Sequence, residues 1–220
     1  MNKKIPILNL RKSDIESMER IYRLNLINSV SGYKSANLIG TRSGQGQSNL
    51  SIVSSVIHLS SSPAIIGFMQ RPASVPRHSY ENIKESGSYT INHIHAEFTD
   101  RAHYTSAKFS REESEFEAAG LTEVYLEDFP APFVKESTIK LGMSFLEEYQ
   151  IRASSTILIV GQVELISLPS NLVKSNGQID LDEASSVAIS GLNNYHQAKM
   201  IASYPYAKPG IFPVNSLKSS

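Results

Sequence analysis

Short apolar runs recur along the chain, and most of them have the spacing of strands. The clearest extends from Ile139 to Phe145, where every second residue is apolar, a pattern typical of a strand with one buried face. We predict further strands at residues 35–41, 49–59, 63–70, 88–95 and 156–168. Residues 42–48 are rich in Gly and Ser and separate the first two, which are therefore expected to form a hairpin.

Helical signals are fewer and predict short helices. Ser13 and Glu16 have the spacing of a capping box near the N-terminus. The apolar residues Ile15, Met18 and Tyr22 then fall on one helical face. This pattern predicts one amphipathic helix before the first strand.

Two further helices are predicted between the strands. Ser79 is the expected N-cap of a short helix that Gly87 ends. A second capping box, Ser110 with Glu113, opens an acidic helix that Gly120 ends. The charge pattern of that acidic helix is typical of a solvated face.

The order of these elements indicates the fold class. The strands follow one another without regularly interposed helices, which disfavours a parallel βαβ sheet. We expect a mainly β fold, an antiparallel barrel decorated by three or four helices. No repeat or linker divides the chain, so a single domain over residues 1–220 is expected, with an extended Pro-containing arm at 204–220.

Composition narrows the possible functions. The 220 residues carry 21 basic and 21 acidic side chains, which argues against a general nucleic-acid or membrane-surface binder. The chain has no cysteine, which excludes disulfides, iron–sulfur clusters and a cysteine nucleophile, so redox chemistry would need a non-covalent cofactor. No targeting segment is visible and the apolar run 157–160 is too short to cross a membrane, so a cytoplasmic protein is expected.

Several common catalytic motifs are missing. Gly44 and Gly46 begin like a dinucleotide fingerprint, but Asn49 occupies the third glycine position and a strand follows instead of a helix. The sequence also lacks a phosphate-binding loop that ends in Gly-Lys-Ser/Thr, a His-Glu-x-x-His motif and a Gly-x-Ser-x-Gly elbow. Hydrolase and nucleotidase functions are therefore disfavoured.

The most informative segment is the start of the helix near residue 80. Arg77, His78 and Ser79 stand where the first backbone amides of a helix are unpaired, an arrangement that suits a phosphate-like anion. The alternative is that Ser79 only caps the helix and that Arg77 is solvated. Residues 47–55 place small hydroxyl side chains along a strand on which a flat ring with polar edges could lie. The alternative there is an edge strand with a polar face.

Three histidines allow a metal site to be considered. His93 and His95 would share one face of a strand, and His103 follows in the next loop. No nearby carboxylate has an obvious ligand spacing. We therefore predict no metal site and keep a histidine-based metal-binding barrel as an alternative.

The order of the segments resembles the flavin-reductase-like family with the FMN-binding split barrel, specifically its flavoredoxin-like branch. The matching stretches are NLIGT at 37–41, SNLS at 48–51, SS at 54–55, PAIIGF at 63–68, RHSYENI at 77–83, YTIN at 89–92, HYTSAK at 103–108, SEF at 114–116 and GLNNY at 191–195. The match covers the chain from about residue 25 to residue 209, so the N-terminal helix and the C-terminal arm are expected to be peripheral.

The resemblance implies a homodimer of Greek-key split barrels with one FMN per subunit near the interface. It assigns the FMN phosphate to Arg77 and Ser79, with His78 where other members often have an acidic residue. It implies the following further cofactor-binding residues: Asn49, Leu50 and Ser51 at the isoalloxazine edge, Ser54 and Ser55 near the ribityl chain and phosphate, and Thr41 where its strand approaches the ring. His103 is the candidate catalytic residue, near the nicotinamide or the ring face.

The implied reaction follows from the cofactor. N5 of the isoalloxazine accepts a hydride from NAD(P)H, and the reduced ring passes electrons to flavin or another small-molecule acceptor. We therefore predict an FMN-dependent NAD(P)H oxidoreductase. The alternative is a non-catalytic FMN-carrying electron-transfer protein.

Overall fold

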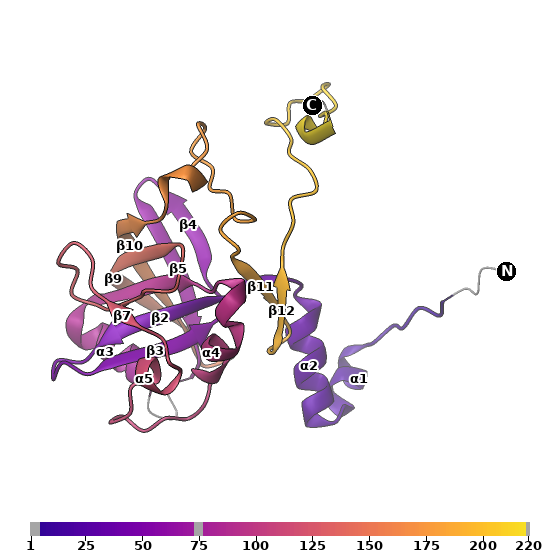
Figure 1. Ribbon diagram of the computed structural model, residues 1–220. Helices are drawn as coiled ribbons and strands as arrows, with labels where there is room; N and C mark the ends of the chain where they lie inside the picture. The colour runs from indigo at the N-terminus through magenta and orange to yellow at the C-terminus, as the bar shows by residue number, and fades with distance from the viewer. Residues whose placement is uncertain (1–4, 73–76, 219–220) are drawn as a thin grey trace.

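The centre of the molecule is one curved antiparallel sheet (Figure 1), and the computed structural model describes residues 5–72 and 77–218. Its strands are β2 (Asn37–Arg42), β3 (Ser48–Val53), β4 (Ile57–Ser61), β5 (Ala64–Gln70), β6 (Ser88–His93), β9 (Lys140–Ile151) and β10 (Thr156–Ser167). They lie in the order β3-β2-β6-β9-β10-β5-β4, and every neighbouring pair is antiparallel. The predicted mainly β, antiparallel class is confirmed, as is the hairpin of β2 with β3.

The sheet curls into an open barrel because its two edges are tied together. β3 and β4 lie at opposite edges, yet residues 54–56 alone connect them. That connection reaches about 15 Å at most, whereas the edges of a flat sheet of this size would lie about 29 Å apart. The Ser55 hydroxyl holds the connection against β5, because it donates to the Met69 carbonyl at 3.2 Å and accepts from the Met69 amide at 3.0 Å.

Helices and two small sheets complete the fold. The helices are α1 (Lys12–Ser17), α2 (Arg20–Val30), α3 (His78–Ser86), η1 (Ala96–Phe98), α4 (Thr99–Tyr104), α5 (Glu115–Ala118), η2 (Ser170–Leu172) and η3 (Ser216–Lys218). The remaining strands are β1 (Lys34–Ser35), β7 (Glu123–Val124), β8 (Phe133–Val134), β11 (Val187–Ser190) and β12 (Asn194–Gln197). β1, β11 and β12 form one small sheet, and β7 pairs with β8.

The two faces of β2 contribute to different apolar clusters, because successive side chains of a strand point to opposite faces. Leu38 belongs to the cluster that contains Phe98 and Phe116, beside α5. Ile39 belongs to the barrel cluster that contains Ile83 of α3. β2 and β3 are therefore packed between α3 and α5, which gives the polar side chains of this region a fixed support.

The predicted N-terminal helix is two helices in the structure. α1 ends at Ser17, and the Glu19 carboxylate accepts hydrogen bonds from the Ile21 and Tyr22 amides at 2.7 and 2.9 Å. A side chain that satisfies these unpaired amides starts a new helix. The prediction of one continuous helix was therefore wrong.

Two other predicted boundaries also differ. The strand predicted over 49–59 divides into β3 and β4, because the chain crosses between the sheet edges at 54–56. The acidic helix is shorter than predicted. The Ser110 amide does bind the Glu113 carboxylate at 3.0 Å, but the helix that follows begins only at Glu115.

Both ends of the chain extend away from the barrel (Figure 1) and carry exposed apolar side chains. On α2 these are Ile21, Tyr22, Leu24, Ile27 and Val30, and on the C-terminal segment they are Ile201, Tyr204, Tyr206, Ile211, Phe212, Val214 and Leu217. Within the described part of the chain, no helix has the length and apolar character that crossing a membrane requires. The exposed residues therefore mark surface that the barrel itself does not cover.

Candidate functional site

The start of α3 is the centre of the candidate site. Arg77 precedes the helix in a non-helical conformation, and its carbonyl accepts the first helical bond from the Glu81 amide at 2.9 Å. Ser79 is therefore inside the helix and is not the N-cap that the sequence predicted. Gly87 ends the helix as predicted, with a positive φ of 70° that favours glycine.

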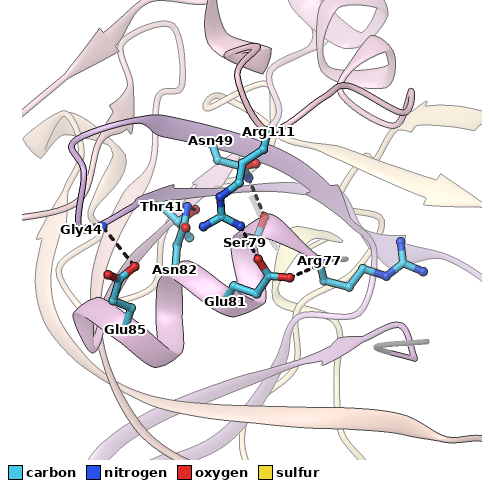
Figure 2. A network of polar contacts seen from close by, with 9 residues as sticks. All are labelled: Thr41, Gly44, Asn49, Arg77, Ser79, Glu81, Asn82, Glu85 and Arg111. Carbon is cyan, nitrogen blue, oxygen red and sulfur yellow. Dashed lines mark hydrogen bonds and ion pairs between the residues drawn. The ribbon is translucent and has the colours of Figure 1, made fainter. Parts of the chain in front are cut away.

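The side chain of Ser79 instead joins α3 to β3. Its hydroxyl lies 2.7 Å from the Asn49 side-chain amide and 2.8 Å from the Ser51 hydroxyl. Asn49 and Ser51 project towards α3 together because they are two residues apart on one strand. Ser79 and Asn49 are only 7% and 6% exposed. The structure thus brings together three of the predicted site residues, the buried Asn49 and Ser79 (Figure 2) and the half-buried Ser51, in one polar cluster.

A second buried pair lies beside this cluster. Asn82, one helical turn after Ser79, donates from its side-chain amide to the Thr41 hydroxyl at 3.1 Å. Thr41 is fully buried, so it supports Asn82 from behind. The other polar atom of the Asn82 amide, Oδ1, is buried and has no hydrogen-bond partner among the described residues. An unpartnered buried amide atom of this kind indicates a position where a ligand or water completes the bonding.

A small pocket opens against Asn82. It encloses about 90 Å³ and is lined by the hairpin loop (Ser43, Gln45, Gln47), Asn49, His78 and Asn82 of α3, and Arg111 with Glu112. A water molecule occupies about 30 Å³ in the liquid. The pocket therefore has room for a few waters or one phosphate-sized anion.

Two arginines lie on different sides of the α3 start. Arg111 lines the pocket and its guanidinium pairs with Glu81 (Figure 2). Burial alone would raise the pKa of Glu81, but the bonds from Arg111 and from the Arg77 amide lower it. The Arg77 side chain points away from Ser79 in Figure 2, and its Nε donates to the Pro72 carbonyl at 3.3 Å.

Arg111 was not predicted from the sequence. It lies in the acidic segment before α5, where its neighbours have the composition of a solvated surface. Only the tertiary fold brings it to α3, about thirty positions earlier in the chain. A local motif therefore carries no signal for it.

Glu115 is the second site residue that the sequence did not identify. The residue is only 7% exposed, and its carboxylate accepts a hydrogen bond from the Leu50 amide at 3.0 Å. Burial raises its pKa, the Leu50 amide opposes this, and the nearby Glu113 charge raises the pKa further. The interpretation of the whole acidic helix as a solvated face was therefore wrong for Glu115.

The other predicted binding residues lie along the same strand but have different environments. The Leu50 side chain is fully buried, and its amide is already bonded to Glu115. Ser55 is bonded to Met69 in the chain crossing, and Ser54 is half-buried beside it. The Ser51 hydroxyl is shared with Ser79, so Ser54 is the serine of this segment whose hydroxyl has no hydrogen bond within the described structure.

The three histidines have separate partners. Nδ1 of His93 lies 3.1 Å from the Ser186 hydroxyl, and burial lowers the pKa of His93 to about 4. Nδ1 of His103 lies 3.1 Å from the Tyr195 hydroxyl, and His103 is not among the residues that line the pocket. Across residues 5–72 and 77–218, no group of three or more His, Cys, Asp or Glu side chains could hold a metal. The catalytic role of His103 stays a prediction.

This open antiparallel barrel with a polar pocket at α3 has the fold of the split-barrel flavin reductases. The family model of the flavin reductase like domain matches residues 32–182, more than half of the chain, and the chain belongs to this family. The resemblance found in the sequence is confirmed.

Individual relatives agree with this assignment. A Shewanella frigidimarina protein assigned as a flavin reductase with a split-barrel domain is 46% identical, with a TM-score of 0.88, over 91% of this chain and 100% of that one. Component B of nitrilotriacetate monooxygenase from Bacillus cereus is 18% identical, with a TM-score of 0.76, over 89% and 98% of the two chains. Flavoredoxin of Desulfovibrio vulgaris is 19% identical, with a TM-score of 0.69, over 80% and 92%.

A curated relative from Halalkalibacterium halodurans gives a shorter match. It is 32% identical over 105 residues, which is 47% of this chain and 50% of that protein. The chain thus spans about half the length of this curated relative. The two structures below 25% identity show the shared fold alone.

Proposed function

We propose that the protein is an FMN-dependent oxidoreductase that takes a hydride from NAD(P)H and passes electrons to free flavin or another small acceptor. The observation that carries the proposal is the polar pocket at the start of α3, in a chain of the flavin reductase like family. Its volume and its donors suit the phosphate of a flavin mononucleotide. The larger flavin ring would then lie outside the pocket.

The residues around α3 supply suitable phosphate ligands. The unpaired amides at a helix start carry partial positive charge, and α3 is long enough to have a full set of them. The Arg111 guanidinium, which lines the pocket, adds a side-chain donor to this set. The Ser79 hydroxyl lies behind the lining, bonded to the lining residue Asn49, and would add a second donor. Arg77 is a second cation on the other flank of the helix start.

We place the isoalloxazine beside the half-buried end of β3, from Ser51 towards Ser54. Bound FMN supplies the redox chemistry, with N5 as the hydride acceptor. The residues of the chain hold and orient the cofactor. The buried pair of Thr41 and Asn82 joins α3 to β2, the neighbour of β3, and would thereby set the distance between the phosphate and ring sites.

We also propose that the working unit is a homodimer. The apolar side chains exposed on α2 and on the C-terminal segment have no cover within one chain of the described structure. Large apolar side chains exposed in such number mark an interaction site. A second copy of this chain would cover it and also close the open side of the flavin site.

The function is tested first by visible absorption. Purified protein is mixed with FMN, or with FAD in a parallel sample, and then desalted. Flavin absorption that survives desalting with FMN supports the cofactor assignment, and retention of FAD alone contradicts it. The same samples are then assayed for NAD(P)H oxidation with added free flavin.

The oxidation assay separates the proposed enzyme from its alternative. Oxidation of NADH or NADPH that depends on the protein supports the oxidoreductase. A protein that retains FMN, is not reduced by either nicotinamide and accepts electrons only from another reductant would be the non-catalytic FMN carrier. Free-flavin reduction without any retained FMN would show that flavin is a substrate here and not a bound cofactor.

A further inference from the structure

Asn49 links the buried Glu115 carboxyl to the two hydroxyls at the proposed phosphate site. One polar atom of its side-chain amide faces the Ser79 hydroxyl at 2.7 Å. The other faces both oxygens of Glu115, at 3.2 and 3.3 Å. The Ser79 hydroxyl in turn lies 2.8 Å from that of Ser51. A continuous hydrogen-bonded chain therefore joins α5, β3 and α3.

The amide of Asn49 has two possible orientations in this chain, and the proton on Glu115 selects between them. With an ionised carboxylate, only the NH₂ group can face Glu115, because two oxygens without a hydrogen between them repel. The Asn49 oxygen then accepts from Ser79. With a protonated carboxyl group, the Asn49 oxygen accepts from Glu115, and the NH₂ group donates to Ser79.

The two orientations leave different numbers of free hydroxyl hydrogens. When Glu115 is ionised, Ser79 donates to Asn49 and Ser51 donates to Ser79, so both hydrogens are used inside the chain. When Glu115 is protonated, Asn49 donates to Ser79, and the Ser79–Ser51 contact needs only one hydroxyl hydrogen. The other hydrogen is then free to bind an anionic oxygen.

We propose that Glu115 is a positioning residue that, through Asn49, sets the hydrogen-bond direction of Ser79 and Ser51, so that phosphate binding at Ser79 is accompanied by proton uptake at Glu115. The inference rests on the proposed flavin site. Glu115 does not touch the ligand itself. It determines whether the two hydroxyls can donate to it.

The surroundings of Glu115 favour its protonated form, so the carboxyl group can take up a proton when a ligand binds. Its burial and the Glu113 charge raise the pKa of the carboxyl group above its ordinary value. β3, which α5 contacts, carries no ionisable side chain. On the neighbouring α4, Arg101 binds the Gly120 carbonyl and pairs with Glu136, His103 binds Tyr195, and Asp100 is exposed. The described neighbours therefore place no cation on Glu115.

The test compares FMN affinity across pH in the wild type and in Glu115→Gln, by quenching of flavin fluorescence. Proton uptake on binding makes the wild-type affinity fall as pH rises through the Glu115 pKa. The side-chain amide introduced by Glu115→Gln would donate to the Asn49 oxygen at every pH, as a protonated Glu115 does. We expect Glu115→Gln to bind FMN about tenfold more tightly than the wild type at alkaline pH, the scale of one hydrogen bond to a charged group.

The controls separate this effect from others. The FMN phosphate titrates near pH 6 in every variant, so the difference between variants is the quantity measured. Glu117→Gln removes the same charge from the exposed face of α5 and should follow the wild type. In a Ser79→Ala background, Glu115→Gln should no longer change the affinity, because the hydroxyl that it frees is gone.

The outcomes distinguish this inference from the proposed function. If the wild type binds FMN and Glu115→Gln has the same affinity at every pH, Glu115 does not control the site and the inference is wrong. A Glu115→Gln effect that persists in Ser79→Ala would also contradict it, since the coupling would then bypass Ser79. If no variant binds FMN, the proposed function is wrong, and this inference is wrong with it.

Discussion

At the scale of single residues, the two arginines near α3 raise the question of which one binds the proposed phosphate. Arg111 lines the pocket but is paired with Glu81, whereas Arg77 lies outside it and binds the Pro72 carbonyl. A bound phosphate would compete with Glu81 for the Arg111 guanidinium, since both are anions that form the same charge-assisted bonds. Arg111 therefore needs only a change of partner to reach the ligand.

Arg111→Ala is expected to weaken FMN binding by about 1–2 kcal/mol, less than a fully buried charged hydrogen bond because this side chain is partly exposed to solvent. Titration of FMN at low and high salt measures it, and the loss should shrink as salt screens the pair. Arg77→Ala is the matched comparison and should weaken binding too, as the family resemblance implies. A loss confined to Arg77→Ala would place the phosphate on the other flank of α3.

Some residues of the candidate site could be predicted from the sequence, and others could not. Ser79, Asn49 and Ser51 were predicted as site residues from their local pattern, and the structure brings them together. Glu115 and Arg111 were not, because each lies in a segment whose charges look solvated. Their partners lie 65 and 30 positions away in the chain, and a pattern of neighbouring residues cannot reveal contacts between positions so far apart.

At the scale of elements, alternation of apolar residues predicted the strands well where one face is buried. β9 begins one residue after its predicted start, and β10 begins at the predicted residue. The same rule failed at 49–59, because apolar residues recur in β3, at Val56 in the crossing and again in β4. The closure of the barrel is a property of the whole sheet, so it decides that boundary.

The close packing of β10 against Tyr89 in the barrel core can be tested at this scale. A Cβ at Gly161 would lie 2.2 Å from the Tyr89 hydroxyl oxygen and 2.8 Å from the Ser144 carbonyl oxygen. That hydroxyl is buried and has no hydrogen-bond partner in the part of the chain that the structure describes. The absence of a side chain at Gly161 thus leaves room for the Tyr89 ring, whose hydroxyl forms no hydrogen bond that would stabilise the fold.

Gly161→Ala is expected to lower the free energy of unfolding by about 1–3 kcal/mol, the usual cost of overpacking. Tyr89→Phe should leave it unchanged or raise it by about 1 kcal/mol, because the substitution removes an unpaired buried hydroxyl. The double variant should recover part of the Gly161→Ala loss, and the Ser144 carbonyl contact should keep the rest. Denaturant unfolding of all four proteins measures this coupling, and strictly additive losses would contradict it.

At the scale of the whole molecule, the barrel and its two extended ends differ in character. The barrel buries its apolar residues in two clusters. The C-terminal segment extends away from it (Figure 1), and both Tyr206 and Phe212 are 92% exposed. Such residues stabilise a structure only when another surface covers them. The proposed second copy supplies that surface, and the flavin site at the open barrel edge would then depend on it.

The dimer and its link to flavin binding are tested with one variant. The double substitution Tyr206→Ser and Phe212→Ser is expected to shift the protein from dimer to monomer in size-exclusion chromatography with light scattering, since it removes two large apolar contacts. FMN affinity should fall with it if the partner closes the site. Ile166→Ser, a change of an exposed apolar residue of β10, controls for a general loss of surface hydrophobicity. A wild type that is monomeric with FMN bound would contradict the proposed assembly, and a monomeric variant with unchanged FMN affinity would show that each barrel holds its flavin alone.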